Sequence, residues 1–133
     1  MPRTCLAFAS LVACLLSAAC ATTDDLDSED RALSFDCGDS VVIGSLENNR
    51  DYQHVEIEDD ILGHGWMTGA LAVQRTVAGY KLEGRVPVRY FGHTYLRGDR
   101  TFMFVLTPKD DGVYHLRDQR LMSDRPRPTS ECE

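Results

Sequence analysis

Apolar side chains recur at every second position along most of the chain after Gly38. A period of two places side chains alternately on the two faces of a β-strand, whereas an amphipathic helix needs a period of roughly 3.6. The clearest segments are TGALAVQRTV (68–77), GRVPVRYF (84–91) and RTFMFVL (100–106). Both faces of the last segment are apolar, so we expect a central strand there, and Pro87 indicates an edge or a bulge.

Weaker strands are expected at 40–47, 52–58 and 113–117, and turn-forming residues separate the segments at 48–51, 78–79, 98–99 and 108–112. No segment after the first twenty residues predicts a long amphipathic helix. Short strands with turns at this spacing are typical of a small barrel or sandwich. We expect an all-β domain over residues 37–133, built as a small antiparallel barrel of five or six strands.

The first nineteen residues have the order of parts of a secretory signal peptide. Arg3 precedes an apolar run at 6–16, and small residues follow the run. The run covers about half of the roughly 20 residues that span a bilayer, so we do not expect a permanent membrane helix. Residues 1–19 are therefore predicted to be removed on export.

Cys20 follows small residues and resembles the cysteine of a bacterial lipobox, which is lipidated after cleavage. Ser17 departs from that pattern, which prefers leucine three positions before the cysteine. Ordinary cleavage after Ala21 is the alternative. Lipidation at Cys20 is the favoured prediction.

These cleavages limit how the cysteines can pair. Cys5 and Cys14 leave with the signal, and Cys20 is either removed or lipidated, so two thiols remain. Two thiols in an oxidising compartment form one disulfide. We predict a bond between Cys37 and Cys132 that closes the domain.

Residues 20–36 are strongly acidic without a sustained periodicity, so we expect a flexible tether. Leu33 and Phe35 either dock on the domain or order only the last turn before Cys37. The chain has a formal net charge of −7, and Arg3 is the only charge lost with the signal. An acidic chain repels polyanions, so we expect no nucleic acid as partner, and membrane contact only through the lipid anchor.

The sequence carries no catalytic signature such as G-x-S-x-G. His64 and His93 lie beside glycines, which would let the backbone approach a ligand, but no pair of histidines has metal-ligand spacing. We therefore expect no metal and no cofactor. A small periplasmic hydrolase or metal-binding protein that uses these two histidines is the alternative function.

Aromatic and basic side chains gather in RYFGHTYLRGDR (89–100), and GHGWM (63–67) adds a tryptophan. These residue types are enriched in binding hot spots. The candidate binding surface consists of Trp66, Tyr90, Phe91, His93, Tyr95 and Arg97. The competing interpretation, in which the aromatics fill a small barrel and the arginines border its strands, is favoured.

Between residues 37 and 132 the chain resembles exported bacterial domains of the OB-barrel or netrin-like type. In those domains a cysteine precedes a first strand like DSVVIGSL, later strands resemble ALAVQRTVAGY, GRVPVRYF and TFMFVLTP, and a second cysteine closes the chain. Netrin-like inhibitors of metalloproteinases carry an exposed N-terminal cysteine beside a C-x-C, which is lacking here. The resemblance implies an OB-like fold and a binding module, without a functional residue.

These observations predict a non-enzymatic binding or envelope-associated module. We expect a lipid anchor at Cys20 in the outer membrane of a Gram-negative cell, with the domain facing the periplasm. A soluble periplasmic or secreted form is the alternative. The expected partner is an envelope protein or a small ligand.

Overall fold

A computed structural model describes residues 31–132, and its regular structure is β apart from one 3-10 turn. The strands are β1 (Ala32–Phe35), β2 (Ser40–His54), β3 (Gly65–Ala78), β4 (Gly84–Gly92), β5 (Phe102–Thr107), β6 (Tyr114–Leu121) and β7 (Arg127–Ser130), and the turn η1 (Met122–Asp124) precedes β7. The prediction of an all-β class is confirmed. In the part of the chain that the structure describes, no helix is long and apolar enough to cross a membrane.

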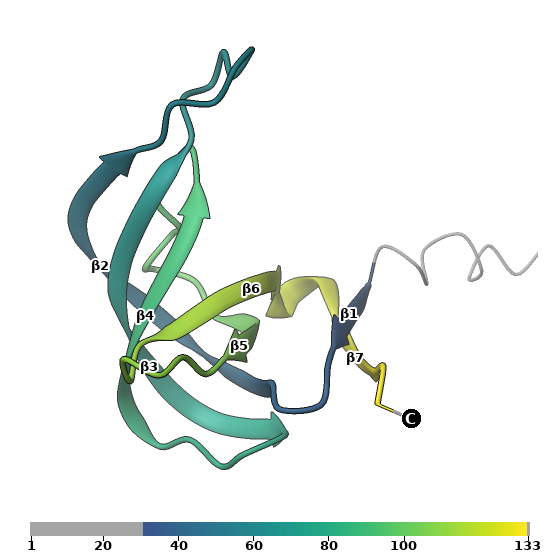
Figure 1. The fold of residues 1–133 in the computed structure, drawn as a ribbon. Coiled ribbons are helices and arrows are strands. Elements are labelled where there is room, and N and C mark those ends of the chain that lie inside the picture. The colour runs from purple at the N-terminus through teal and green to yellow at the C-terminus, as the bar shows by residue number, and fades with distance from the viewer. Residues whose placement is uncertain (1–30, 133) are drawn as a thin grey trace, which may run out of the picture.

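Five strands form a closed ring in the hydrogen-bonded order β2-β3-β4-β6-β5, and β5 pairs back with β2 (Figure 1). Neighbours in the ring are antiparallel except for β4 and β6, which are parallel. The expectation of a wholly antiparallel arrangement is therefore wrong at this pair. The β2–β3 hairpin projects beyond the ring and ends in a loop at residues 55–64 (Figure 1).

The interior of the ring is filled by one cluster of buried side chains. They are Val42, Leu46, Met67, Leu71, Val88, Tyr90, Phe102, Phe104, Leu106 and Leu116. β5 pairs with β2 on one side and β6 on the other, and its residues 102–106 are all buried. The predicted central strand is confirmed.

A second apolar cluster lies outside the ring, where Leu33 packs with Val41, Ile43, Met103 and Val105. Leu33 comes from β1, which pairs in parallel with β7 and is fully buried at this position. Residues 32–35 thus belong to the folded domain and not to the tether predicted over 20–36. Cys20, the signal at 1–19 and the rest of that tether up to residue 30 lie outside the described residues.

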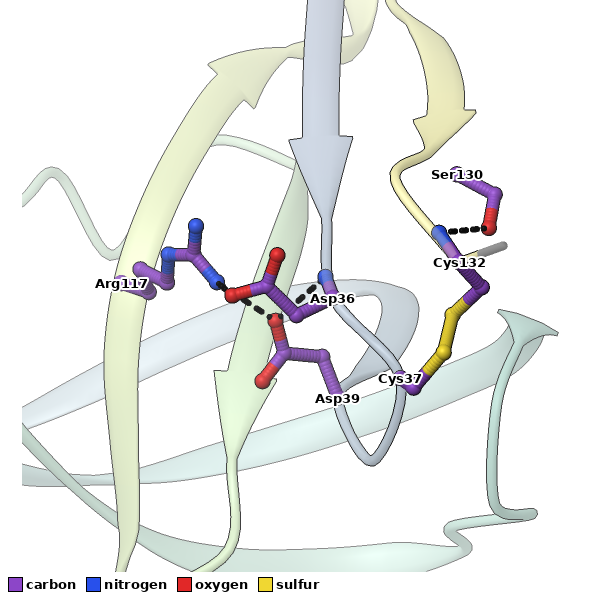
Figure 2. Close-up of a disulfide and its surroundings, with 6 residues drawn as sticks. All are labelled: Asp36, Cys37, Asp39, Arg117, Ser130 and Cys132. Carbon is purple, nitrogen blue, oxygen red and sulfur yellow. Dashed lines mark hydrogen bonds and ion pairs between the residues drawn. A yellow bond between two sulfur atoms is a disulfide. The ribbon is translucent and has the colours of Figure 1, made fainter.

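The structure joins Cys37 to Cys132, as predicted from the cysteine count (Figure 2). The buried carboxylate of Asp39 lies close by and accepts hydrogen bonds from the Asp36 N–H (2.9 Å) and from Arg117 (3.0 Å). Arg117 also pairs with the Asp36 carboxylate. The turn that carries Cys37 is therefore attached to β6 through Arg117 and to the C-terminal segment through the disulfide.

Candidate functional site

Trp66 and Phe91 stand opposite each other on the outer side of the ring. They are partners in the β3–β4 register, and their ring centroids are 5.2 Å apart. Their neighbours Met67 and Tyr90 are buried in the interior, so alternation directs Trp66 and Phe91 outward. Phe91 is 43% exposed.

Three histidines extend this pair in both directions. His64 stacks on Phe91 with centroids 5.6 Å apart, and His93 lies 5.3 Å from His64. On the other side His115, from β6, lies 5.4 Å from Trp66. We call His93, His64, Phe91, Trp66 and His115 the aromatic row.

Arg89 adds a positive charge to the aromatic row, because its guanidinium carbon lies 4.4 Å from the centre of a Trp66 ring. Arg89 is the partner of Thr68 in β3 and of His115 in β6. The Thr68 hydroxyl donates to Asp51 Oδ2 (2.6 Å), and this bond, together with the nearby Arg89, lowers the pKa of Asp51. Arg89 therefore lies between a carboxylate and an aromatic face.

Asp60 fixes the orientation of His64. The Asp60 carboxylate accepts hydrogen bonds from the backbone N–H groups of His64 (2.6 Å), Gly63 (3.0 Å) and Leu62 (3.1 Å). These bonds, above all that from the His64 N–H, lower the pKa of Asp60 from 3.8 to about 2. His64 Nδ1 lies 2.9 Å from both Asp60 oxygens and must carry the hydrogen, since a carboxylate only accepts. Neutral His64 thus keeps Nε2 as an acceptor.

The surroundings of His115 favour the neutral form of its ring. Burial lowers its pKa below the usual value of 6.5, and the charges of Lys109 and Arg89 act in the same direction. The two fixed cations beside it, not His115 itself, therefore supply the positive charge at this end of the aromatic row.

The structure brings together only part of the predicted binding surface. Trp66, Phe91 and His93 meet in the aromatic row, but Tyr90 is 3% exposed and belongs to the interior. Its hydroxyl donates to Asn48 Oδ1, and burial raises the pKa of Tyr90. Tyr90 is therefore a packing residue, as the competing interpretation holds.

Tyr95 and Arg97 lie in the loop between β4 and β5, which also carries His93. Tyr95 is 37% exposed, and within residues 31–132 no ring contact joins it to the aromatic row. The Arg97 guanidinium pairs with Asp99 at 2.6 Å. Neither residue is brought into the site.

Sequence reasoning missed Arg89 and His115. The signal for Arg89 was present, because it is two residues before Phe91 and so shares its face of the strand. No local signal existed for His115, since it reaches Trp66 only through the parallel pairing of β4 with β6.

Two adjacent hollows flank the aromatic row. One, of about 430 Å³, includes His64, His93 and Gln119, and the other, of about 440 Å³, includes Trp66, Lys109 and His115. Phe91, Leu116 and Arg117 line both. A larger hollow of about 600 Å³ lies between the end of β3 and the loop at 79–84, and its lining contains no aromatic ring and no histidine.

The donors for a metal ion do not converge. Among residues 31–132, no three side chains of histidine, cysteine, aspartate or glutamate are grouped so that they could hold a metal ion. His64 and His93 are neighbours, but one nitrogen of His64 is already bonded to Asp60.

Comparison with protein-family models, with curated proteins and with solved structures found no match for this chain.

Proposed function

We propose that this chain is a non-enzymatic binding module and that its ligand contacts the aromatic row. The observation that carries the proposal is the position of five aromatic rings outside a ring of strands whose interior is already filled. Rings that are not needed for the core expose apolar surface to water. A ligand that covers these rings removes that surface from water, and the free energy of this burial favours binding. Arg89 adds a charge for an anionic group.

We infer further that the ring of strands is an OB-like barrel. Numbered within the ring alone, the strands follow the order 1-2-3-5-4, with the third and fifth parallel, and this supports the inference. Trp66 and Phe91, at the centre of the aromatic row, then lie on the second and third strands of the barrel, the face that OB-folds use for ligands. The OB-like topology and the position of the aromatic row therefore support the same surface as the ligand-binding surface.

We also propose that the module is exported and anchored through a lipid on Cys20 in the outer membrane, facing the periplasm. The support is the order of charge, apolar run and small residues before Cys20. Intact mass of the chain expressed in a Gram-negative host should show a membrane-bound species that starts at Cys20 and carries a diacylglyceryl group and an acyl chain. A soluble species that starts at Thr22 would contradict the anchor and favour the periplasmic form.

Photo-crosslinking in the envelope tests the aromatic row directly. A benzoylphenylalanine placed at Phe91 of the full chain should give an adduct on irradiation. Tyr80, which is 70% exposed in the loop after β3, is the matched control position and should give none. Added to the Phe91 probe, Trp66→Ala should weaken the adduct, because truncating a central aromatic anchor costs about 2 kcal/mol or more of binding.

Two results would contradict this assignment of the surface. One is equal labelling at the two positions, which would indicate unspecific encounters. The other is an adduct at Phe91 whose yield Trp66→Ala leaves unchanged. Mass analysis of the adduct distinguishes a protein partner from a small ligand.

A second candidate function, a periplasmic hydrolase or metal protein, is favoured by one observation. Asp60 holds His64 with its Nε2 free, as a carboxylate orients a general base, and His93 lies beside it. Stoichiometric zinc or copper in the purified protein, lost in the double variant His64→Ala and His93→Ala, would establish this function in place of the first.

A further inference from the structure

The ring of strands is held together at one seam by very little pairing. β4 and β6 pair only through Val88 with Tyr114 and Arg89 with His115, although β4 continues to Gly92 and β6 to Leu121. Beyond these residues the two strands separate. Within the described part of the chain, no backbone hydrogen bond joins residues 90–92 to residues 116–121. Residues 90–92 of β4 and 116–118 of β6 therefore leave their facing backbone edges unpaired, whereas the Gln119 N–H donates to Asp118 Oδ1 (2.8 Å) and its carbonyl accepts from Arg120 (2.9 Å).

The two hollows beside the aromatic row lie along this seam. One is lined by residues 90–92 of β4 and by Leu116, Arg117 and Gln119 of β6. The other continues it past Phe91 toward Trp66 and Lys109. The free edges, the hollows and the aromatic row thus form one elongated groove, which we call the seam groove.

The charges that line the seam groove all have one sign. Its fixed charges are those of Lys109 and Arg117, its three histidines count as uncharged polar groups in the net charge of −7, and its lining contains no aspartate or glutamate. The charge of Arg117 is offset on its far side by Asp36 and Asp39. Lys109 is exposed and has no ion pair among the described residues, so it remains available to an anion.

We propose that the seam groove binds an extended acidic peptide, which adds as a strand to the free backbone edges of β4 and β6. The inference rests on the proposed function, because the aromatic row forms one wall of the groove. Backbone hydrogen bonds hold such a peptide, and pockets beside the edge select its alternate side chains. Carboxylates of the peptide lie toward Lys109, and its apolar side chains contact Phe91 and Trp66.

A peptide fits these features better than a nucleic acid does. Free N–H and C=O groups on a strand edge require a partner with both donors and acceptors at the spacing of a polypeptide. A phosphodiester backbone offers only acceptors.

The test uses a capped oligoglutamate peptide as the probe, because repulsion between its charges keeps it extended. Calorimetric titration of the full chain should show binding at low salt. The same peptide with alternate amides N-methylated keeps its charge but loses the donors for strand pairing, and should bind at least about tenfold more weakly. Its glutamine analogue should bind at least about threefold more weakly, because Lys109 then meets no carboxylate.

A matched pair of variants places the binding in the groove. Lys109→Gln should weaken oligoglutamate binding by about threefold or more, as expected for one lost charge contact. Lys81→Gln removes the same charge near the larger hollow, where the side chain is 78% exposed, and should leave the affinity unchanged.

Three results would overturn the peptide inference. The first is equal affinity of the N-methylated peptide, which would indicate an anion site without strand pairing. The second is tighter binding of oligothymidylate than of oligoglutamate. The third is absence of peptide binding while the Phe91 probe still gives its Trp66-dependent adduct, which would leave the aromatic row as a binding surface for another class of ligand.

Discussion

Replacing Cys37 and Cys132 together by serine is expected to lower the free energy of unfolding by about 4 to 5 kcal/mol. The two cysteines are 95 residues apart in sequence, so the bond greatly restricts the unfolded chain. It also joins the segment after β7 to the turn after β1. The loss is a large part of the roughly 5 to 15 kcal/mol that stabilises a small domain.

Urea unfolding of the wild type and of the double serine variant measures this loss. Reductant should shift the wild type to the transition of the variant and leave the variant itself unchanged. A difference below about 1 kcal/mol would show that the remaining contacts close the domain without the bond.

Phe104→Ala is expected to lower the free energy of unfolding by about 3 to 5 kcal/mol. Phe104 is fully buried inside the ring, with its ring centroid 5.5 Å from that of Phe102. The substitution loses the free energy gained by burying the phenylalanine side chain. It also leaves a cavity, because the surrounding strands cannot move together to fill the space. Urea unfolding followed by circular dichroism gives the value.

Phe91→Ala is the matched control, since the same substitution is made on the outer side of the ring. It should change stability by less than about 1 kcal/mol, because the side chain is 43% exposed and only its contacts with Trp66 and His64 are lost. It should nevertheless remove ligand binding. Equal destabilisation by both substitutions would assign Phe91 to packing and remove the main support for a recognition surface.

The sequence predicted where the strands lie better than it predicted which strands pair with each other. Alternation located the segments that became β3, β4 and β5, and Pro87 indicated an edge just before the point where β4 begins to pair with β6. The parallel pairing of β4 with β6 has no local signature, because it depends on how the strands close the ring. Only this pairing brings His115 beside Trp66.

Composition misled the prediction in two places. Residues 32–35 follow a run of acids and were expected in a tether, with docking of Leu33 left open as one of two alternatives. The burial of Leu33 depends on contacts with β2 and β5 that no window of sequence contains, so the sequence alone did not decide between them. Tyr90 and Phe91 were grouped by residue type, although adjacent residues of a strand point to opposite faces. Alternation in the sequence does place Tyr90 on one face and Arg89 with Phe91 on the other, but the candidate surface was chosen by residue type instead.

The parallel pairing of β1 with β7 has a mechanical consequence for a domain held by its N-terminal segment. A pull along β1 from Ala32 loads the backbone hydrogen bonds between the two strands together, in shear, rather than opening them one after another. Once those bonds yield, the force passes to Cys37, which is covalently joined to Cys132. Traction can therefore strip β1 from β7, but at Cys37 the load divides between the backbone that leads into β2 and the disulfide that leads to Cys132.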